Sequence, residues 1–555
     1  MVNMRRPVVK TMKFTDFLLA GSLGEMTSFS SAAYLVIFFP ASLILYSIVP
    51  QKAKKYFLLI ESFVFYWLIS GNLIIYLILS ILSIHYFALW LDRINTQKVA
   101  AVKAAESENR KEIKKQYVAK SRRVLALAAV LHIGILLVLK YSPFFTGNIN
   151  SLFEFFGFSF RFDVPSYLQP IGISFFSLQA FSYVFDVYRG TTKADDNIFR
   201  LGLFMSFFPQ IVEGPICRYE QTAMKLWNVE KIRYENLVLG LERFAYGLLK
   251  KIVIADRLNA PVKEMFNNYN EYPGGTVVIA AVFYTIQLYA HFSGAMDAVM
   301  GAAQIFGVEM PENFRRPFFS KTISEFWQRW HITLGAWFRD YIFYPVTMSK
   351  PMKKLTSSAR KKLGNHFGPL LAGSIALFCV WLCNGLWHGA GWTYIFFGMY
   401  HFVLILIGSM VAPLVSAVNK KLHINPEWFG YRLIQIIRTF VFVVIGELFF
   451  RAETLSDGFG MIKKAVTDFT FPTIGDFLGS TFKISHGGIV SLGVALALVF
   501  VISLLNEKGV NVRESLRKRN VVLRWILLYL MVMFIFVFGA YGPDYIPVDP
   551  IYANF

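Results

Sequence analysis

The feature that most constrains this chain is a succession of apolar stretches, each close to the length of a membrane-crossing helix. A helix needs roughly 17–25 predominantly apolar residues to cross a hydrocarbon core about 30 Å thick. The stretches predict an all-α, polytopic integral membrane protein of about 11 to 13 transmembrane or re-entrant helices. They lie near residues 31–50, 56–70, 72–91, 124–141, 167–186, 198–216, 236–255, 276–292, 368–387, 392–412, 431–450, 488–505 and 522–541.

The composition excludes a soluble multidomain protein of this size. Only 16% of the 555 residues are charged, whereas 55% are hydrophobic and 17% aromatic. Soluble proteins carry roughly 25% charged residues, so this chain cannot build the polar coat that several soluble domains need. Cys217, Cys379 and Cys383 have no framework spacing, so no disulfide scaffold is predicted.

The net charge of +21 is concentrated between the apolar stretches, at 92–123, 350–362, 420–432 and 508–524. The positive-inside rule predicts that these basic blocks are cytoplasmic, and 92–123 is expected to be a cytoplasmic loop. The scheme places both chain ends outside, although basic residues near the N-terminus conflict with it. A nucleic-acid partner is not expected because no soluble basic module is visible. The lipid bilayer is the expected partner of the apolar surface.

Proline and glycine interrupt the apolar stretches of the middle third, at Pro170–Gly172 and from Pro209 to Pro215. Irregular backbone survives at membrane depth only where protein or a water-filled cavity surrounds it. We therefore expect re-entrant or tilted helices around a functional site in this third and plain scaffold elsewhere.

A first polar cluster runs from Ser324 to Tyr341 and includes a histidine, His331. Read as one helix, it places Trp327, His331, Leu334 and Phe338 on a single face that points inward. Ionisable residues within apolar sequence are costly and are therefore candidates for function. The charged and aromatic candidates of this cluster are Arg329, Trp330, Arg339 and Asp340.

A second cluster, Asn384 to Trp392, contains His388 within a Gly-rich and Trp-rich turn, together with Trp387. In the topology scheme this turn approaches from the external side and His331 from the cytoplasmic side. A neutral imidazole is cheap to bury and can move a proton from an attacking alcohol to a leaving thiolate. The other histidines are expected to be structural or interfacial, with His291 and His401 as the strongest exceptions. A metal site is not expected, because too few ligands lie within reach.

These clusters belong to a series of motifs that resembles a known family. The series consists of Phe292–Asp297, Pro311–Phe318, Glu325–His331, Phe338–Tyr341 and Gly385–Trp392, preceded by Pro170–Phe176, Asp186–Gly190, Phe207–Pro215 and Lys250–Asp256. It is similar to the membrane-bound O-acyltransferases, and within them to the bacterial alginate O-acetylation branch. The resemblance implies an N-terminal extension at 1–26 and a single transmembrane domain at 27–555, with the catalytic core segment at 292–402. One departure is Ala295-Met296-Asp297, where the family has a serine before the aspartate.

The resemblance implies that His331 and His388 are the two active-site histidines, with His388 as general base and His331 positioning the reacting groups. The residues expected to support them or to bind substrate are Trp330, Arg329, Arg339, Asp340, Asn384, Trp387, Asp297 and Asn313. No metal and no bound cofactor are expected, because a thioester donor, acetyl-CoA or an acyl carrier protein, is a substrate.

The expected function is transfer of an acetyl or short acyl group to hydroxyls of an extracytoplasmic glycan, directly or through a carrier. The resemblance also implies an extracytoplasmic glycan-modifying partner protein and a bacterial cytoplasmic membrane. The basic loops either dock an acyl carrier protein or only set topology.

Three alternatives stay open at this point. The first is D-alanyl transfer to teichoic acid from an acyl carrier protein, a related activity with both histidines. The second is a polytopic transporter, which broken helices and buried polar groups also suit, although no inverted repeat is visible. The third is a catalytically silent assembly scaffold.

Overall fold

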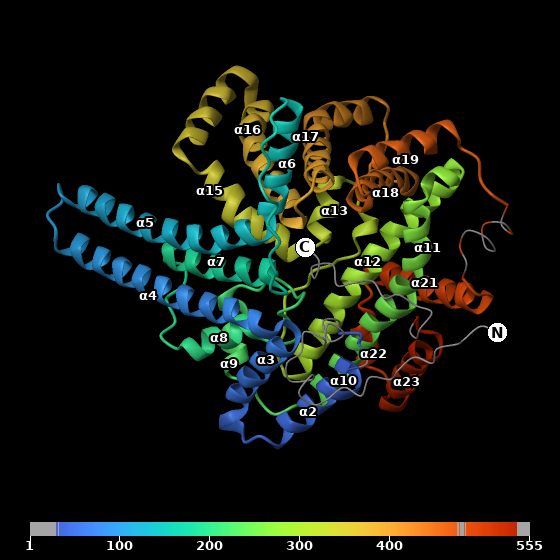
Figure 1. The fold of residues 1–555 in the computed structure, drawn as a ribbon, viewed down its shortest axis with the longest axis horizontal. Coiled ribbons are helices and arrows are strands. Elements are labelled where there is room, and N and C mark those ends of the chain that lie inside the picture. The colour runs from blue at the N-terminus through green and yellow to red at the C-terminus, as the bar shows by residue number, and fades with distance from the viewer. Residues whose placement is uncertain are drawn as a thin grey trace.

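A computed structural model describes residues 29–31, 33–473, 475, 477, 482 and 484–540 of the chain (Figure 1). Within this part the regular elements are helices, together with one isolated antiparallel bridge between Phe314 and Trp330. The all-α prediction is therefore confirmed. The extension expected at 1–26 and the C-terminal tail after residue 541 lie outside the described residues.

The N-terminal part contains two long antiparallel helices that project to the left in Figure 1. They are α4 and α5, and their outer ends carry the basic segment 92–123, which is helical apart from a short turn at 105–109. Alanine, lysine and glutamate favour helix, which explains the extension. The helices of this part are η2 (Ala33–Phe38), α2 (Phe39–Ile48), α3 (Lys54–Ser70), α4 (Ile74–Ala104), α5 (Arg110–Leu136), η5 (Leu137–Tyr141) and α6 (Ser142–Phe155).

The middle and C-terminal parts hold the remaining helices. The middle part comprises α7 (Ile173–Arg189), α8 (Ile198–Ser206), α9 (Tyr219–Trp227), α10 (Tyr234–Leu248), η6 (Leu249–Ala255), α11 (Asp256–Asn267), α12 (Gly274–Ile305), α13 (Ile323–Arg329), α14 (Ile332–Phe338), η9 (Arg339–Phe343) and α15 (Tyr344–Thr347). The C-terminal part comprises α16 (Lys350–His388), α17 (Trp392–Lys421), α18 (Phe429–Arg451), α19 (Leu455–Thr467), α21 (His486–Glu507), α22 (Val512–Arg517) and α23 (Val521–Phe538).

In the described residues, 8 helical stretches are long and apolar enough to cross a membrane. One of them, Gln51–Ala104, joins two stretches that the sequence separates. The segments expected at 167–186 and 198–216 are helical only in part, and α8 ends at Ser206 before an irregular buried segment. The segment expected at 236–255 is helical throughout, from α10 into η6, but it carries four charged residues and is not among the 8 stretches. The chain is a multi-pass membrane protein, and its middle third has the broken helices that the sequence predicts.

Helices α10 and α12 approach each other at glycines spaced seven residues apart on both. A Cβ atom on Gly247 would lie 2.5 Å from the carbonyl oxygen of Gly294, and one on Gly301 would lie 2.6 Å from that of Gly240. Small residues at a helix interface allow this backbone contact within a membrane. The contact fixes the two helices from which several polar residues described below project.

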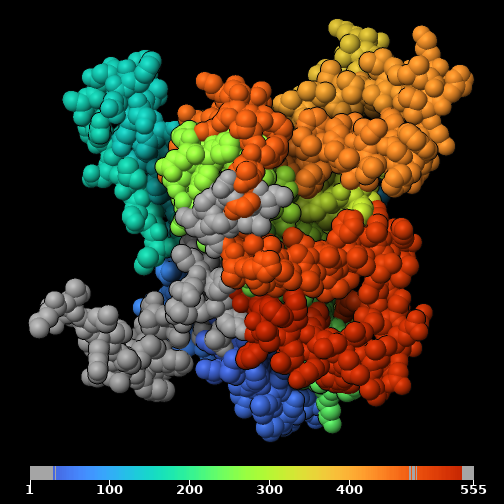
Figure 2. All heavy atoms as spheres, turned by 90° about the vertical axis from the view of Figure 1, so that its right-hand side faces the viewer, coloured from blue at the N-terminus to red at the C-terminus, as the bar shows by residue number. Residues whose placement is uncertain are grey.

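Large apolar side chains are exposed on the outer helices, as a surface in contact with lipid requires. On α23, for example, Tyr529, Phe536 and Val537 are each at least 60% exposed. Figure 2 shows α6 and the residues after it standing clear of the neighbouring helices on one face. Buried aromatic side chains form a separate cluster at the centre, around Phe292, Trp330, Trp337 and Trp387.

Candidate active site

His331 lies at a break between two short helices, so the single helix expected from 324 to 341 is wrong. Helix α13 ends at Arg329, Trp330 is extended, and His331 has left-handed backbone angles (φ 45°, ψ 52°) before α14 begins. The break is imposed by a neighbouring segment, because Trp330 forms an antiparallel bridge with Phe314. The predicted apolar stripe is consequently divided: the Trp327 ring contacts the ring of His401, whereas His331 faces Phe292 and Trp387.

The side chain of Asn313 fixes the orientation of His331. Its Oδ1 accepts hydrogen bonds from the backbone N–H of Thr333 (3.0 Å) and from the Thr333 hydroxyl (2.9 Å), and it lies 3.2 Å from Nδ1 of His331. A backbone N–H can only donate, so the Asn313 atom that faces it is the oxygen. His331 must therefore donate from Nδ1, which makes Nε2 the basic nitrogen of its neutral ring.

Two further contacts complete this network. The hydroxyl of Thr333 accepts from the backbone N–H of Ile216 (3.0 Å), and the Asn313 amide donates to the sulfur of Met296 (3.1 Å). Met296 occupies the position where the family motif has a serine, and here its sulfur accepts a hydrogen bond. His331 itself is 2% exposed. Burial, and secondly the imidazole of His388, lower the pKa of His331 below its ordinary value, so the ring is held neutral.

His388 is the last residue of α16, and it is 7% exposed. Close packing of α16 against α17 fixes the turn after it, because a Cβ on Gly385 would lie 2.5 Å from the carbonyl oxygen of Tyr394. Aromatic rings surround the imidazole, with Phe450 at 5.1 Å and Phe397 at 5.9 Å between centroids. Its Nδ1 is buried and makes no hydrogen bond to any described residue.

The indole of Trp387 contacts both histidines. Its ring centroid lies 5.7 Å from that of His331 and 5.1 Å from that of His388. Asn384 lies one helical turn before His388 and on the same face of α16, and its Oδ1 is buried without a hydrogen-bond partner among the described residues. The structure thus brings together His331, His388, Trp387 and Asn384. Asn313 also belongs to this site because it contacts His331, and Trp330 belongs to it through the bridge with Phe314, the residue after Asn313.

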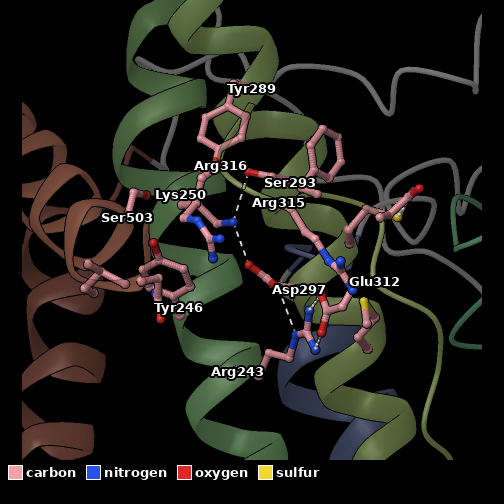
Figure 3. Close-up of a pocket in the computed structure, with 16 residues that line it drawn as sticks. Arg243, Tyr246, Lys250, Tyr289, Ser293, Asp297, Glu312, Arg315, Arg316 and Ser503 are labelled. Atoms are coloured by element: carbon pink, nitrogen blue, oxygen red, sulfur yellow. Dashed lines mark hydrogen bonds and ion pairs between the residues drawn. The ribbon is translucent and has the colours of Figure 1, made fainter. Parts of the chain in front are cut away.

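A polar cavity of about 140 Å³ is lined in part by Asn313, and Figure 3 shows its charged residues. Asp297 projects into it from α12 and pairs with Lys250 (2.6 Å) and Arg243 (2.8 Å), and Arg243 also holds Glu312 through two hydrogen bonds. Asp297 is therefore a member of an ion-pair network next to the histidine site and is not a ligand of either imidazole. The cavity reaches the His331 network through Asn313, which lines both.

Three residues expected at the site lie elsewhere. Arg329 forms ion pairs with Glu325 (2.7 Å) and Glu507 (3.0 Å). The side chain of Arg339 is 57% exposed and pairs with its neighbour Asp340, whose carboxylate also contacts Arg218 (3.3 Å). These charges stabilise the surroundings of α13 and η9, and their ion-pair partners are one another, Glu325, Glu507 and Arg218.

Several residues that contact the site were missed by sequence reasoning. Lys140 and Tyr141 of η5 bind the carbonyl oxygens of Trp387 and Leu386, directly before His388. Lys140 is a charged residue inside an apolar stretch, so the rule that selected His331 also selects it. Thr333 and Met296 carried no such signal, because their roles depend on Asn313.

The two other histidines singled out from the sequence are also buried. His401 contacts the rings of Trp327, Trp381 and Phe397, and His291 lies on α12. Neither imidazole has a hydrogen-bond partner among the described residues. Across the same part of the chain, no group of three His, Cys, Asp or Glu side chains is arranged to hold a metal ion.

Comparison with known proteins decides what kind of molecule carries these residues. The profile of the membrane-bound O-acyltransferase family matches residues 73–360, more than half of the chain. A protein named probable alginate O-acetylase, from Pseudomonas aeruginosa, is 32% identical over 431 residues, which cover 77% of this chain and 72% of the relative. The chain belongs to the membrane-bound O-acyltransferase family. It is accordingly an O-acyltransferase, and the resemblance seen in its motifs is confirmed.

Two relatives within this O-acyltransferase family differ in what their names say they modify. The peptidoglycan O-acetyltransferase of Helicobacter pylori is 27% identical over 464 residues, 79% of each chain. The teichoic acid D-alanyltransferase of Bacillus subtilis is 29% identical over 290 residues, 51% of this chain and 69% of the relative. The similarity to the two O-acetylating relatives therefore covers much more of the chain.

Proposed function

We propose that this O-acyltransferase moves an acetyl or similar short acyl group from a cytosolic thioester to hydroxyls of an extracytoplasmic glycan in the bacterial cytoplasmic membrane. The observation that carries the proposal is the pair of buried imidazoles that both contact the Trp387 ring. The long match to alginate-acetylating and peptidoglycan-acetylating relatives supports acetyl as the acyl group.

In this reaction the hydroxyl oxygen attacks the thioester carbonyl while its proton passes to His388. The C–S bond then breaks, and the imidazolium returns the proton to the thiolate, so that the products are an ester and a thiol. General acid–base help of this kind is worth about 10²–10⁴-fold. Nδ1 of His388 and Oδ1 of Asn384 are buried polar atoms without described partners, and they suit an acceptor hydroxyl. His331, with Nε2 as its basic nitrogen, orients the reacting groups.

The cavity behind Asn313 is the proposed approach of the donor. Arg243, Lys250, Arg315 and Arg316 line it, together with two carboxylates. Such cations suit the anionic groups that an acyl-CoA and the prosthetic group of an acyl carrier protein share. The thioester donor is consumed as a substrate, so the proposed reaction uses no bound cofactor.

The acceptor side requires a glycan that lies outside the membrane. A glycan-modifying partner protein on that side is part of the proposal, because the enzyme is embedded and its acceptor is a polymer. D-alanyl transfer to teichoic acid is the second candidate, supported by the shorter match to that relative.

Acyl transfer by the purified protein in vesicles tests the proposal. Acetyl-CoA is supplied on one side and a glycan oligosaccharide on the other, and both thiol release and ester formation are followed. We expect His388→Ala to lower both by about 10³-fold or more, to a small residual rate, while the protein remains folded. Transfer at the wild-type rate by this variant would refute the assignment. Mass spectrometry of envelope polymers from a deletion strain separates loss of acetyl esters from loss of D-alanyl esters.

A further inference from the structure

The end of α16 is held by side chains from a distant segment of the chain. The last four carbonyl groups of a helix have no partner within that helix. In α16 the carbonyl oxygen of Trp387 accepts a hydrogen bond from Nζ of Lys140 at 2.7 Å, and that of Leu386 accepts one from the hydroxyl of Tyr141. The two bonds join positions that are more than 240 residues apart in the sequence.

Both donors belong to η5, a π-helical turn inserted between α5 and α6. Such turns are rare, and they are found frequently at functional sites. Lys140 is 4% exposed and Tyr141 is 5% exposed, so neither side chain is an ordinary surface group. A buried ammonium at a helix C-terminus is favourable because the carbonyl end of the helix carries partial negative charge.

The helix after η5 is α6, and it binds the far end of the turn that follows α16. The indole N–H of Trp392 donates to Oδ1 of Asn148 at 2.8 Å, and the ring of Phe144 packs edge-on against Trp392 at 5.8 Å. The backbone from Leu386 to Trp392, which carries His388, is therefore attached at both ends to the segment 140–148.

We infer that Lys140 and Tyr141 are positioning residues for His388, holding the imidazole and the Trp387 ring in place through the carbonyl groups at the end of α16. The inference rests on the proposed role of His388 in acyl transfer. Lys140 acts through the backbone carbonyl of Trp387, so we expect its effect in the catalytic step. A misplacement of about 1 Å can cost on the order of 10²-fold in rate.

The main variant is Lys140→Met, which keeps most of the stem and removes the donor. We expect kcat for acyl transfer to fall by about 10- to 100-fold with KM for the donor changed less than about threefold. Lys140→Arg restores a donor and should recover most of the loss. Tyr141→Phe removes a single hydroxyl and should lower kcat by about 3- to 10-fold. Lys114→Met, at an exposed lysine of the preceding helix α5, is the matched control and should leave kcat unchanged.

A double variant separates positioning from general stability. If Lys140 acts only through His388, then Lys140→Met should not lower the residual rate of His388→Ala any further. An equal fold-loss in both backgrounds would overturn the inference, and so would a wild-type kcat for Lys140→Met. All rates are divided by the folded fraction, and if Lys140→Met does not fold, Tyr141→Phe and Asn148→Ala decide by the same criteria. A wild-type protein that transfers no acyl group would refute the proposed function, whereas normal transfer by Lys140→Met would refute this inference alone.

Discussion

The two histidines of the site are held in place in different ways. His331 is fixed by its own side chain, through the amide of Asn313 and the groups that converge on it. His388 is fixed through the backbone, by donors to the two carbonyl groups before it, and its Nδ1 has no described hydrogen-bond partner. The partner at Nδ1 fixes the tautomer of His331, whereas Nδ1 of His388 is left open to a hydroxyl of the acceptor. The difference supports different roles for two residues that look equivalent in the sequence.

The largest expected effect tests this difference directly. We expect His388→Gln to lower kcat by about 10³-fold or more, because glutamine fills the site but cannot accept the proton. His331→Asn should cost about 10²-fold, because asparagine tolerates the left-handed backbone and preserves a polar group. Single-turnover kinetics on the two variants measure both losses. A larger loss for His331→Asn would exchange the two roles.

The next effect concerns the residue that gives His331 its tautomer. Asn313→Leu leaves the N–H of Thr333, the hydroxyl of Thr333 and Nδ1–H of His331 without their common acceptor. Each buried group left unsatisfied costs about 1–3 kcal/mol, so both the thermal midpoint and kcat should fall. Thermal unfolding in detergent measures the first and the vesicle assay the second. An unchanged midpoint would show that this network does not hold the break between α13 and α14.

A change of pH sharpens the same comparison. Burial lowers the pKa of His331, so its neutral form persists below pH 6.5. Asn313→Asp keeps the acceptor but places a carboxylate at Nδ1, which raises that pKa and stabilises the protonated ring. As the pH decreases, we expect kcat of this variant to begin to fall at a pH at least about one unit higher than in the wild type. Coincident acid limbs in the two pH–rate profiles would mean that protonation of His331 does not affect turnover.

The smallest effect is expected outside both histidine environments. The side chain of Arg339 is 57% exposed and pairs with Asp340, and exposed ion pairs contribute about 0–1 kcal/mol. Arg339→Ala should therefore change kcat by less than about threefold. Steady-state kinetics check this, and a loss comparable to that of His331→Asn would mean that Arg339, at the start of η9, takes part in the reaction.

Much of the architecture could be predicted from the sequence because it depends on local properties. Apolar length located the helices, and the glycine-rich turn marked the end of α16 at His388. The break at His331 could not be predicted, since it is imposed by Phe314 and Asn313, which are distant enough in sequence to leave no periodic signal. Arg339 was included because it belongs to a motif, and motif membership says nothing about the direction of a side chain.

The contact between α10 and α12 has a consequence for how the polar cavity can admit a molecule. Glycines place the two backbones in direct contact, so the helices cannot move closer to each other at these positions. The wall that carries Lys250 and Asp297 is thus the rigid one. The other walls are formed by α21, which contributes Ser503, and by the segment after Glu312. The segment after Glu312 also carries Asn313, so a molecule bound in the cavity would lie against the residue that orients His331.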